Sequence, residues 1–225
     1  LVGSEMCIRD RFKMEHCQDF KMINKIFSEA YENVPNGSYV CPKCGWTMTF
    51  YGAQAQCCNK SCLKNIPKKD DLKPLRFQDG NWRLRHGVMR YMCLPGQLEL
   101  KIQKIAEKCG CGAELWPDRD KYDVKITLPD GQVWAIDAKT HRNPYMLKKS
   151  IEKDYVFTHT KAQKVFYVVP DDCLTDYPDY CKICNDALAS NFPDSIAKCV
   201  SMRIFSKELK GEVEDVKLRN YQKKS

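Results

Sequence analysis

The segment from Tyr122 to Lys139 reads YDVKITLPDGQVWAIDAK, and its alternation of side chains decides the fold. Apolar and polar residues alternate over 123–128 and again over 133–139, which predicts two strands with one apolar face each. The sequence Pro129-Asp130-Gly131 between them suits a three-residue loop, because proline presets the first turn position and glycine accepts the left-handed position that follows. The segment therefore predicts a β-hairpin.

The length of this loop decides which residues of the hairpin face each other. With three loop residues, Val124 lies opposite Ile136 and Asp123 lies opposite Asp137. A two-residue loop would instead place Val124 against Asp137 and mix the two faces. Opposed carboxylates repel each other, and burying them without a partner is costly. Since Lys139 shares a face with Asp137, we expect a cation to lie between the acids with a lysine beside it.

Paired carboxylates with a lysine at one end of a sheet suit Mg²⁺ or Mn²⁺, because such ions prefer oxygen ligands and keep several waters. An ion held by Asp123 and Asp137 can lower the pKa of a bound water and neutralise charge on a phosphate, while Lys139 stabilises the transition state or positions the water. Glu99, which opens a predicted helix over 95–110, is the expected third acid, and Glu107 is its alternative.

A second pattern of possible metal ligands lies in the segment YVCPKCGWTMTFYGAQAQCCNKSC, residues 39–62. Cys41 and Cys44 form a CPxCG knuckle, and Cys62 pairs with either Cys57 or Cys58. Two such pairs, separated by a stretch long enough for a short hairpin, are typical of a zinc ribbon. We favour Cys57 over Cys58 as the third ligand, and we expect the ribbon to need zinc to fold.

The composition restricts the class of protein. Of the 225 residues, 43% are apolar and 29% are charged, which favours a packed core over global disorder. The net charge of +8 is a modest indication of a nucleic-acid partner. No apolar run approaches the roughly 20 residues of a membrane span. The 14 cysteines, with CxxC spacing and no signal peptide, favour metal ligands in a reducing cytoplasm over disulfides.

The chain is expected to fall into several parts. The opening LVGSEMCIRDR resembles a translated library-preparation adapter, so residues 1–12 are interpreted as a sequencing-adapter artefact and the native start is expected to be missing. Apolar residues at helical spacing, including Phe20 and Tyr31, predict a helical stub over 13–38. The remaining predicted parts are a zinc ribbon over 39–66, a basic tether over 60–76, an α/β domain over 73–210 and a charged, frayed tail over 211–225.

Within the α/β domain, further elements follow the helix of 95–110 and the hairpin strands. The patterns predict a hairpin around Asp79-Gly80 before that helix. They also predict a helix over 143–157, a buried strand over 164–170, a helix over 179–192 and a strand over 200–209.

The acids and the lysine of the hairpin resemble the motif of a known family. Asp123, followed by Asp137-Ala138-Lys139, resembles the D…(D/E)xK motif of the PD-(D/E)xK, or restriction-endonuclease-like, nuclease superfamily. That resemblance implies an α/β fold whose mixed central sheet is flanked by helices in the order αβββαβ, and Mg²⁺-dependent hydrolysis of DNA. It implies metal ligation by Glu99, Asp123 and Asp137 and the catalytic lysine role for Lys139. Asp118 is the alternative first acid.

A narrower resemblance covers about residues 38–206. YVCPKCGW, LPGQLELKI, LWPDRDKYDV and VWAIDAKTHRNP are similar to the endonuclease found beside prokaryotic Piwi-related defence proteins. This implies a role in antiviral or anti-plasmid defence, with DNA as substrate and a Piwi-related or helicase protein as partner.

Other interpretations of the sequence stay open. The chain could be a catalytically silent nuclease-fold module that binds nucleic acid or a partner protein, or a zinc-ribbon fragment of a topoisomerase-like protein. Cys181 and Cys184, with Cys173 and Cys199, could form a second metal site, although buried core cysteines are commoner. His141 could assist the site but is more simply a polar residue at the end of a strand.

Overall fold

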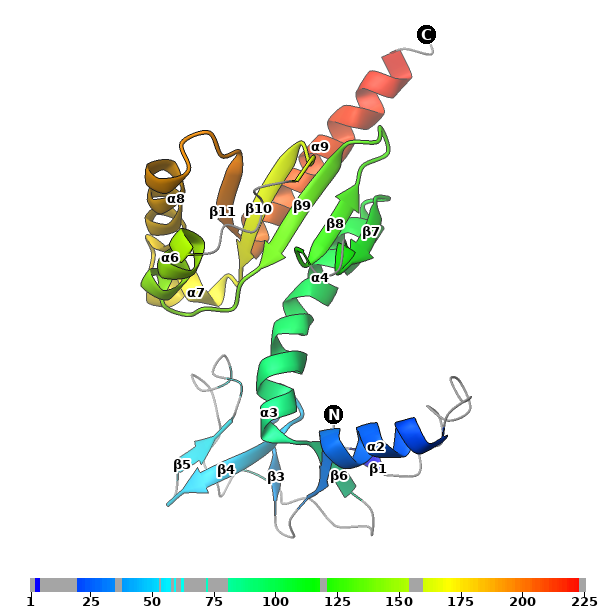
Figure 1. Ribbon diagram of the computed structural model, residues 1–225, viewed down its shortest axis with the longest axis vertical. Helices are drawn as coiled ribbons and strands as arrows, with labels where there is room; N and C mark the ends of the chain where they lie inside the picture. The colour runs from blue at the N-terminus through cyan, green and yellow to red at the C-terminus, as the bar shows by residue number, and fades with distance from the viewer. Residues whose placement is uncertain are drawn as a thin grey trace. The chain divides into compact units, whose positions relative to one another are not determined.

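The computed structural model describes residues 3–4, 20–34, 38–52, 54–57, 59, 62, 72, 81–117, 121–153 and 160–222. The chain divides into two compact units, Leu1–Leu94 and Pro95–Ser225 (Figure 1). In the parts that the structure describes, no helix combines the length and apolar character needed to cross a membrane.

The first unit contains a small sheet and a ribbon. Helix α2 (Phe20–Ala30) leads into β2 (Tyr31–Asn33), which pairs antiparallel with β6 (Asn81–Leu84), and β6 also pairs with β1 (Gly3–Ser4). The predicted helix is confirmed over 20–30, but Tyr31 was wrongly included in it. The pairing of β6 with β2 also joins residues 81–94, with α3 (His86–Val88) and the π-helix η3 (Met89–Cys93), to the first unit rather than to the α/β domain. The Asp79-Gly80 turn lies outside the described residues.

The ribbon is a three-stranded antiparallel sheet of β3 (Tyr39–Val40), β4 (Thr47–Tyr51) and β5 (Gln54–Gln56). Its core is a cluster of four buried sulfur-bearing residues, Met48 and three cysteines. So small a core cannot order the chain by hydrophobic burial alone, which is the usual situation of a ribbon folded around a metal.

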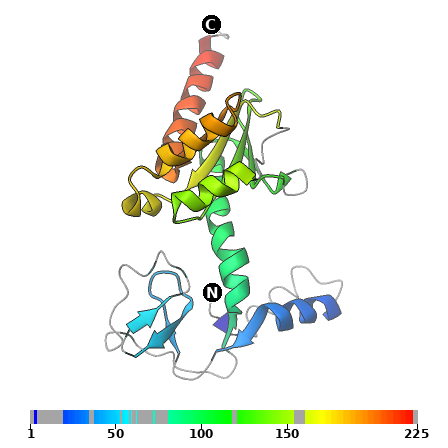
Figure 2. The same cartoon turned by 60° about the vertical axis from the view of Figure 1, so that its left-hand side comes forward.

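The second unit is a three-layer α/β structure (Figures 1 and 2). Its sheet has the order β11-β10-β9-β8-β7, antiparallel from β7 to β9 and parallel from β9 to β11. The strands are β7 (Gly112–Leu115), β8 (Val124–Thr127), β9 (Val133–Ala138), β10 (Lys164–Val169) and β11 (Ala197–Ser201). The helices are α4 (Leu94–Lys108), α6 (Pro144–Lys153), α7 (Asp172–Asp176), α8 (Tyr180–Asn191) and α9 (Met202–Gln222).

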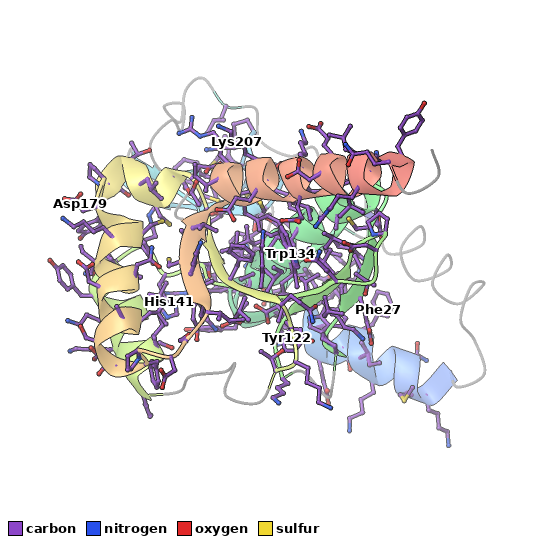
Figure 3. All side chains as sticks on the ribbon, turned by 90° about the horizontal axis from the view of Figure 1, so that it is seen from above. Phe27, Tyr122, Trp134, His141, Asp179 and Lys207 are labelled. Carbon is purple, nitrogen blue, oxygen red and sulfur yellow. The ribbon has the colours of Figure 1, made fainter. Side chains whose placement is uncertain are left out.

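The two faces of this sheet pack against different helices. Val124, Ile126 and Ile136 face the core shared with α4 and α9, and Trp134 is fully buried there beside α9 (Figure 3). Ala135 belongs to the core on the opposite face, shared with α6, α7 and α8. The alternation of residues along β9 thus supplies both layers, as a central strand requires.

The predicted register of the hairpin is confirmed. Val124 pairs with Ile136, and Ile126 pairs with Trp134. The Leu128 N–H donates to the Gln132 carbonyl at 2.8 Å, which closes the three-residue loop. Gly131 has φ of +87°, the left-handed conformation for which glycine was expected.

The C-terminal part of the unit differs from the prediction. The strand ends at Ser201, and the chain continues as one helix, α9, to Gln222. Val200, Met202 and Ile204 alternate like strand residues, yet Ile204 is exposed, whereas Phe205, Leu209, Val213 and Val216 are buried at helical spacing. Residues 202–209 are therefore wrongly predicted as a strand. The predicted frayed tail is helical as far as Gln222 and contributes its two valines to the core.

A side chain of α8 binds the backbone of one residue on the outer strand of the sheet, β11. The Asn185 Nδ2 donates to the Cys199 carbonyl at 3.0 Å, and its Oδ1 accepts from the Cys199 N–H at 2.7 Å. Cys199 lies on β11, which pairs with β10 and with no other strand among the described residues. Cys173, Cys184 and Cys199 are buried in the core that the sheet shares with α6, α7 and α8, as expected of core cysteines.

Candidate active site and cysteine cluster

Asp123 and Asp137 come together beside the C-terminal end of β9. Asp137 is the second-last residue of β9 and pairs with Tyr167 of β10 on its other side. Asp123 directly precedes β8, and its Oδ2 accepts the Ala138 N–H at 2.6 Å. This hydrogen bond fixes one carboxylate against the strand that carries the other. Asp137 is only 3% exposed, whereas Asp123 is half-buried.

The environment of Asp137 favours its protonated form. Burial raises the pKa of Asp137 to about 7, the charge of Lys139 opposes this shift, and the charge and hydrogen bonding of Asp123 add to it. The Lys139 Nζ lies 2.7 Å from Asp137 Oδ2 as an ion pair. An ammonium at this distance only partly offsets the burial of the carboxylate and the charge of Asp123, since the pKa stays raised. A buried carboxylate beside a second acid suits a hard cation, which would also relieve the repulsion between the acids.

Glu99 lies on α4 and is buried, with 8% of its surface exposed. Its Oε2 accepts the indole N–H of Trp116 at 2.8 Å, and the Trp116 backbone N–H donates to the Asp123 carbonyl at 2.9 Å. Trp116 therefore links the helix to the strand end, a role that no local sequence signal indicated. Among the described residues, Glu99 is not gathered with Asp123 and Asp137 into one three-ligand group.

Glu107 and Asp118 were the alternative acids for this site. Glu107, the alternative to Glu99, is exposed on α4. Asp118, the alternative first acid, lies outside the described residues.

Lys139 and His141 follow the acids on the connection from β9 to α6. The Lys139 N–H donates to the Val168 carbonyl at 2.9 Å, so the β9–β10 ladder holds its backbone. The Tyr180 hydroxyl donates to the His141 carbonyl at 2.6 Å. Partial burial and the charge of Lys139 lower the pKa of His141, so its imidazole is neutral at pH 7. Tyr180 is a positioning residue that the sequence could not identify, because it lies 39 positions away.

The second site is a cluster of four cysteines in the ribbon. The Sγ atoms of Cys41, Cys44, Cys57 and Cys62 lie within 4.8 Å of one another, and all four are free thiols. A set of four sulfur ligands from two pairs is the donor set of a structural zinc site. The structure places Cys57 in this cluster, and Cys58 lies outside the described residues.

The two thiols of the first knuckle differ in how readily they ionise. The Gly45 N–H donates to the Cys41 carbonyl at 2.8 Å, and Gly45 has φ of +73°, which a side chain would make unfavourable. Burial opposes ionisation of Cys41, but hydrogen bonds from the Cys44 and Lys43 backbone outweigh it and lower its pKa. Burial and the neighbouring Cys57 raise the pKa of Cys44 to about 11. Four crowded sulfurs therefore need a cation to ionise together.

Comparison with known families gives one match. The family described as "REase associating with pPIWI_RE" matches residues 96–216, more than half of the chain and nearly all of the second unit. The chain belongs to this family. The match confirms the resemblance to a restriction-endonuclease-like domain of Piwi-associated defence systems. Searches of curated proteins and of solved structures found no significant match.

The family match covers the candidate active site but not the ribbon. Glu99, Asp123, Asp137 and Lys139 all lie inside residues 96–216, whereas the four cysteines precede them. The name of the family associates an REase with pPIWI_RE, and the α/β structure of the second unit agrees with a domain of this kind. The ribbon therefore lies outside the matched residues.

Proposed function

We propose that this REase-family chain is a metal-dependent endonuclease that hydrolyses phosphodiester bonds of DNA. The observation that carries the proposal is the carboxylate pair at the end of β9, where the buried Asp137 lies beside Asp123 and forms an ion pair with Lys139 at 2.7 Å. Membership of the REase family supports a nuclease reading of that pair. We further propose that α4, β7, β8, β9, α6 and β10, which follow in the order αβββαβ, form the restriction-endonuclease-like core.

Asp123 and Asp137 are the proposed ligands of Mg²⁺ or Mn²⁺, with Glu99 as a third acid near the same strand ends. The ion would neutralise charge on the phosphate and lower the pKa of a water. The chain contributes the remaining functions. The hydrogen bond from Ala138 orients Asp123, while Lys139 places a positive charge beside Asp137, where it can stabilise a phosphate in the transition state.

The ribbon cysteines are the proposed ligands of a structural Zn²⁺, and the ribbon is proposed to engage nucleic acid. The net charge of +8 supports a polyanionic ligand for the whole chain. We propose a role in prokaryotic antiviral or anti-plasmid defence with pPIWI_RE as partner, a proposal supported by the family's description.

Plasmid cleavage tests the catalytic proposal. The purified protein should nick or linearise plasmid with Mg²⁺ or Mn²⁺ and lose this activity when EDTA is added. Asp137→Asn and Lys139→Ala should each reduce the rate by at least about 10²-fold, since each removes charge from the reaction centre.

Two neighbouring residues provide matched controls. Asp130→Asn changes an exposed acid in the loop of the same hairpin. Lys125→Ala removes a lysine that pairs with Glu114 at 3.3 Å on the adjacent strand. Both controls should cut normally. If the protein binds DNA but never cuts it, with either metal, the silent binding module replaces the nuclease.

A further inference from the structure

Trp116 has a backbone conformation that its side chain disfavours. Its φ of +52° is the only positive value of a non-glycine residue in the part of the chain that the structure describes. For a bulky residue this conformation is a real outlier, and glycine or asparagine would occupy it at lower cost. The turn alone therefore does not explain why a tryptophan occupies this position.

Two hydrogen bonds hold Trp116 in place beside the candidate active site. Its indole N–H donates to Glu99 Oε2 at 2.8 Å, and its backbone N–H donates to the Asp123 carbonyl at 2.9 Å. The first bond has a carboxylate acceptor and fixes the direction of the ring. The ring is therefore oriented from its polar edge by Glu99, while the backbone of the same residue is bonded to the backbone of Asp123, one of the two paired acids.

More than half of the Trp116 surface is exposed. Trp116 is 55% exposed, whereas Trp46 and Trp134 are 3% and 0% exposed. Burial therefore does not explain why this large ring is present. An oriented aromatic face that remains exposed next to a reaction centre is suited to contact a ligand, because little side-chain freedom is lost on binding.

We propose that Trp116 contacts the substrate by stacking its exposed indole face on an unpaired nucleobase next to the phosphate that is cut. The inference rests on the proposed nuclease function and makes it specific for DNA that is locally unpaired. A base is the expected ligand rather than a phosphate, since an indole face offers no positive charge and every base has a π-face. A base inside an intact duplex is already stacked and could not use this surface without being flipped out.

Binding without cleavage is the first test. Fluorescence anisotropy is measured in the Asp137→Asn background, with a labelled duplex that contains a central unpaired stretch and a fully paired duplex of the same length. Trp116→Leu should weaken binding of the unpaired substrate roughly 5- to 100-fold, the range for loss of one base–aromatic stack, and leave the paired duplex unchanged. Trp116→Phe, which keeps a ring face, should stay within about threefold of the parent.

A matched control removes another exposed ring from the same unit. Tyr221 is 75% exposed at the C-terminal end of α9, which lies at the far end of the sheet from the end of β9 (Figure 1). Tyr221→Leu should bind both DNAs like the parent protein.

Intrinsic fluorescence gives a second test, which uses only the conservative substitution Trp116→Phe. Trp116 is the most exposed of the four tryptophans. Its emission should therefore be quenched when the unpaired DNA saturates the protein. The same titration of Trp116→Phe supplies the contribution of the other tryptophans. Quenching that disappears in Trp116→Phe supports the contact, and equal quenching in both proteins overturns it.

The outcomes separate this inference from the nuclease proposal. Unchanged affinity of Trp116→Leu for the unpaired DNA would overturn the inference even if the protein cuts plasmid. An equal loss of affinity for both DNAs would also overturn it, in favour of a purely structural role or a protein ligand. If no cleavage is ever observed but the loss is selective for unpaired DNA, the contact between Trp116 and a base stands and the nuclease proposal fails.

Discussion

Replacing Asp137 by asparagine should stabilise the protein at alkaline pH in the absence of Mg²⁺. Burial raises the pKa of this carboxyl to about 7, against about 3.9 in an unfolded chain. The folded protein therefore keeps a proton that the unfolded chain has released. The corresponding stability is fully present below about pH 4 and is lost as the pH rises through about 7.

The size of the effect follows from the shift. Between pH 5 and pH 7 the unfolded side chain is ionised and the folded one is mostly protonated, and each such pH unit costs about 1.4 kcal/mol. The wild type should therefore lose about 3 kcal/mol relative to Asp137→Asn between pH 5 and pH 8.

Urea unfolding of both proteins at pH 5 and pH 8, with zinc retained and no Mg²⁺ added, measures this difference. Both proteins share the same first unit, so its own pH dependence cancels. Asp130→Asn is the control: slight burial opposes ionisation, but hydrogen bonds from Gln132 outweigh it and lower the pKa of Asp130, so nothing titrates there above pH 5. A change of less than about 0.5 kcal/mol for Asp137→Asn over this range would refute the reasoning.

Three further predictions concern other parts of the chain. Because the Lys139 ammonium lies 2.7 Å from Asp137 Oδ2 and repels a cation placed there, Lys139→Ala should strengthen Mn²⁺ binding by up to about tenfold at pH 9, as measured by calorimetry, and weaker binding would contradict this. Cys57→Ser should lose the bound zinc while Cys58→Ser keeps one zinc per chain in elemental analysis, and the reverse result would exchange their roles. Ending the chain after Lys210 should cost roughly 3 kcal/mol in urea unfolding, since it removes two buried valines; an unchanged midpoint would show that this part of α9 does not stabilise the core.

The hairpin was predictable because its constraints are local. Loop length, the Pro-Asp-Gly turn and the alternation of apolar residues all gave one register, and that register brings Asp123 beside Asp137. Helices α4 and α8 likewise carry apolar residues at helical spacing that become buried. The ends of the second unit were less predictable, because Val200, Met202 and Ile204 fit a strand equally well until Phe205 and Leu209 are packed.

The parts of the site that the sequence could not supply depend on distant contacts. Glu99 was chosen for its place in the helix, but its hydrogen bond to Trp116 depends on how α4 packs beside the strands. The hydrogen bond from the Tyr180 hydroxyl to the His141 carbonyl likewise joins residues far apart in the chain. The assignment of residues 81–94 to the first unit required the pairing of β6 with β2, a long-range contact with no short-range signal.

The amide of Asn185 has a consequence for how the sheet meets other chains. An outermost strand normally offers a row of free peptide groups on which a foreign strand can grow, in recognition or in aggregation. Here a side chain imitates the missing neighbour by occupying both peptide groups of Cys199. An incoming polypeptide would first have to displace that amide before it could pair with β11 at Cys199.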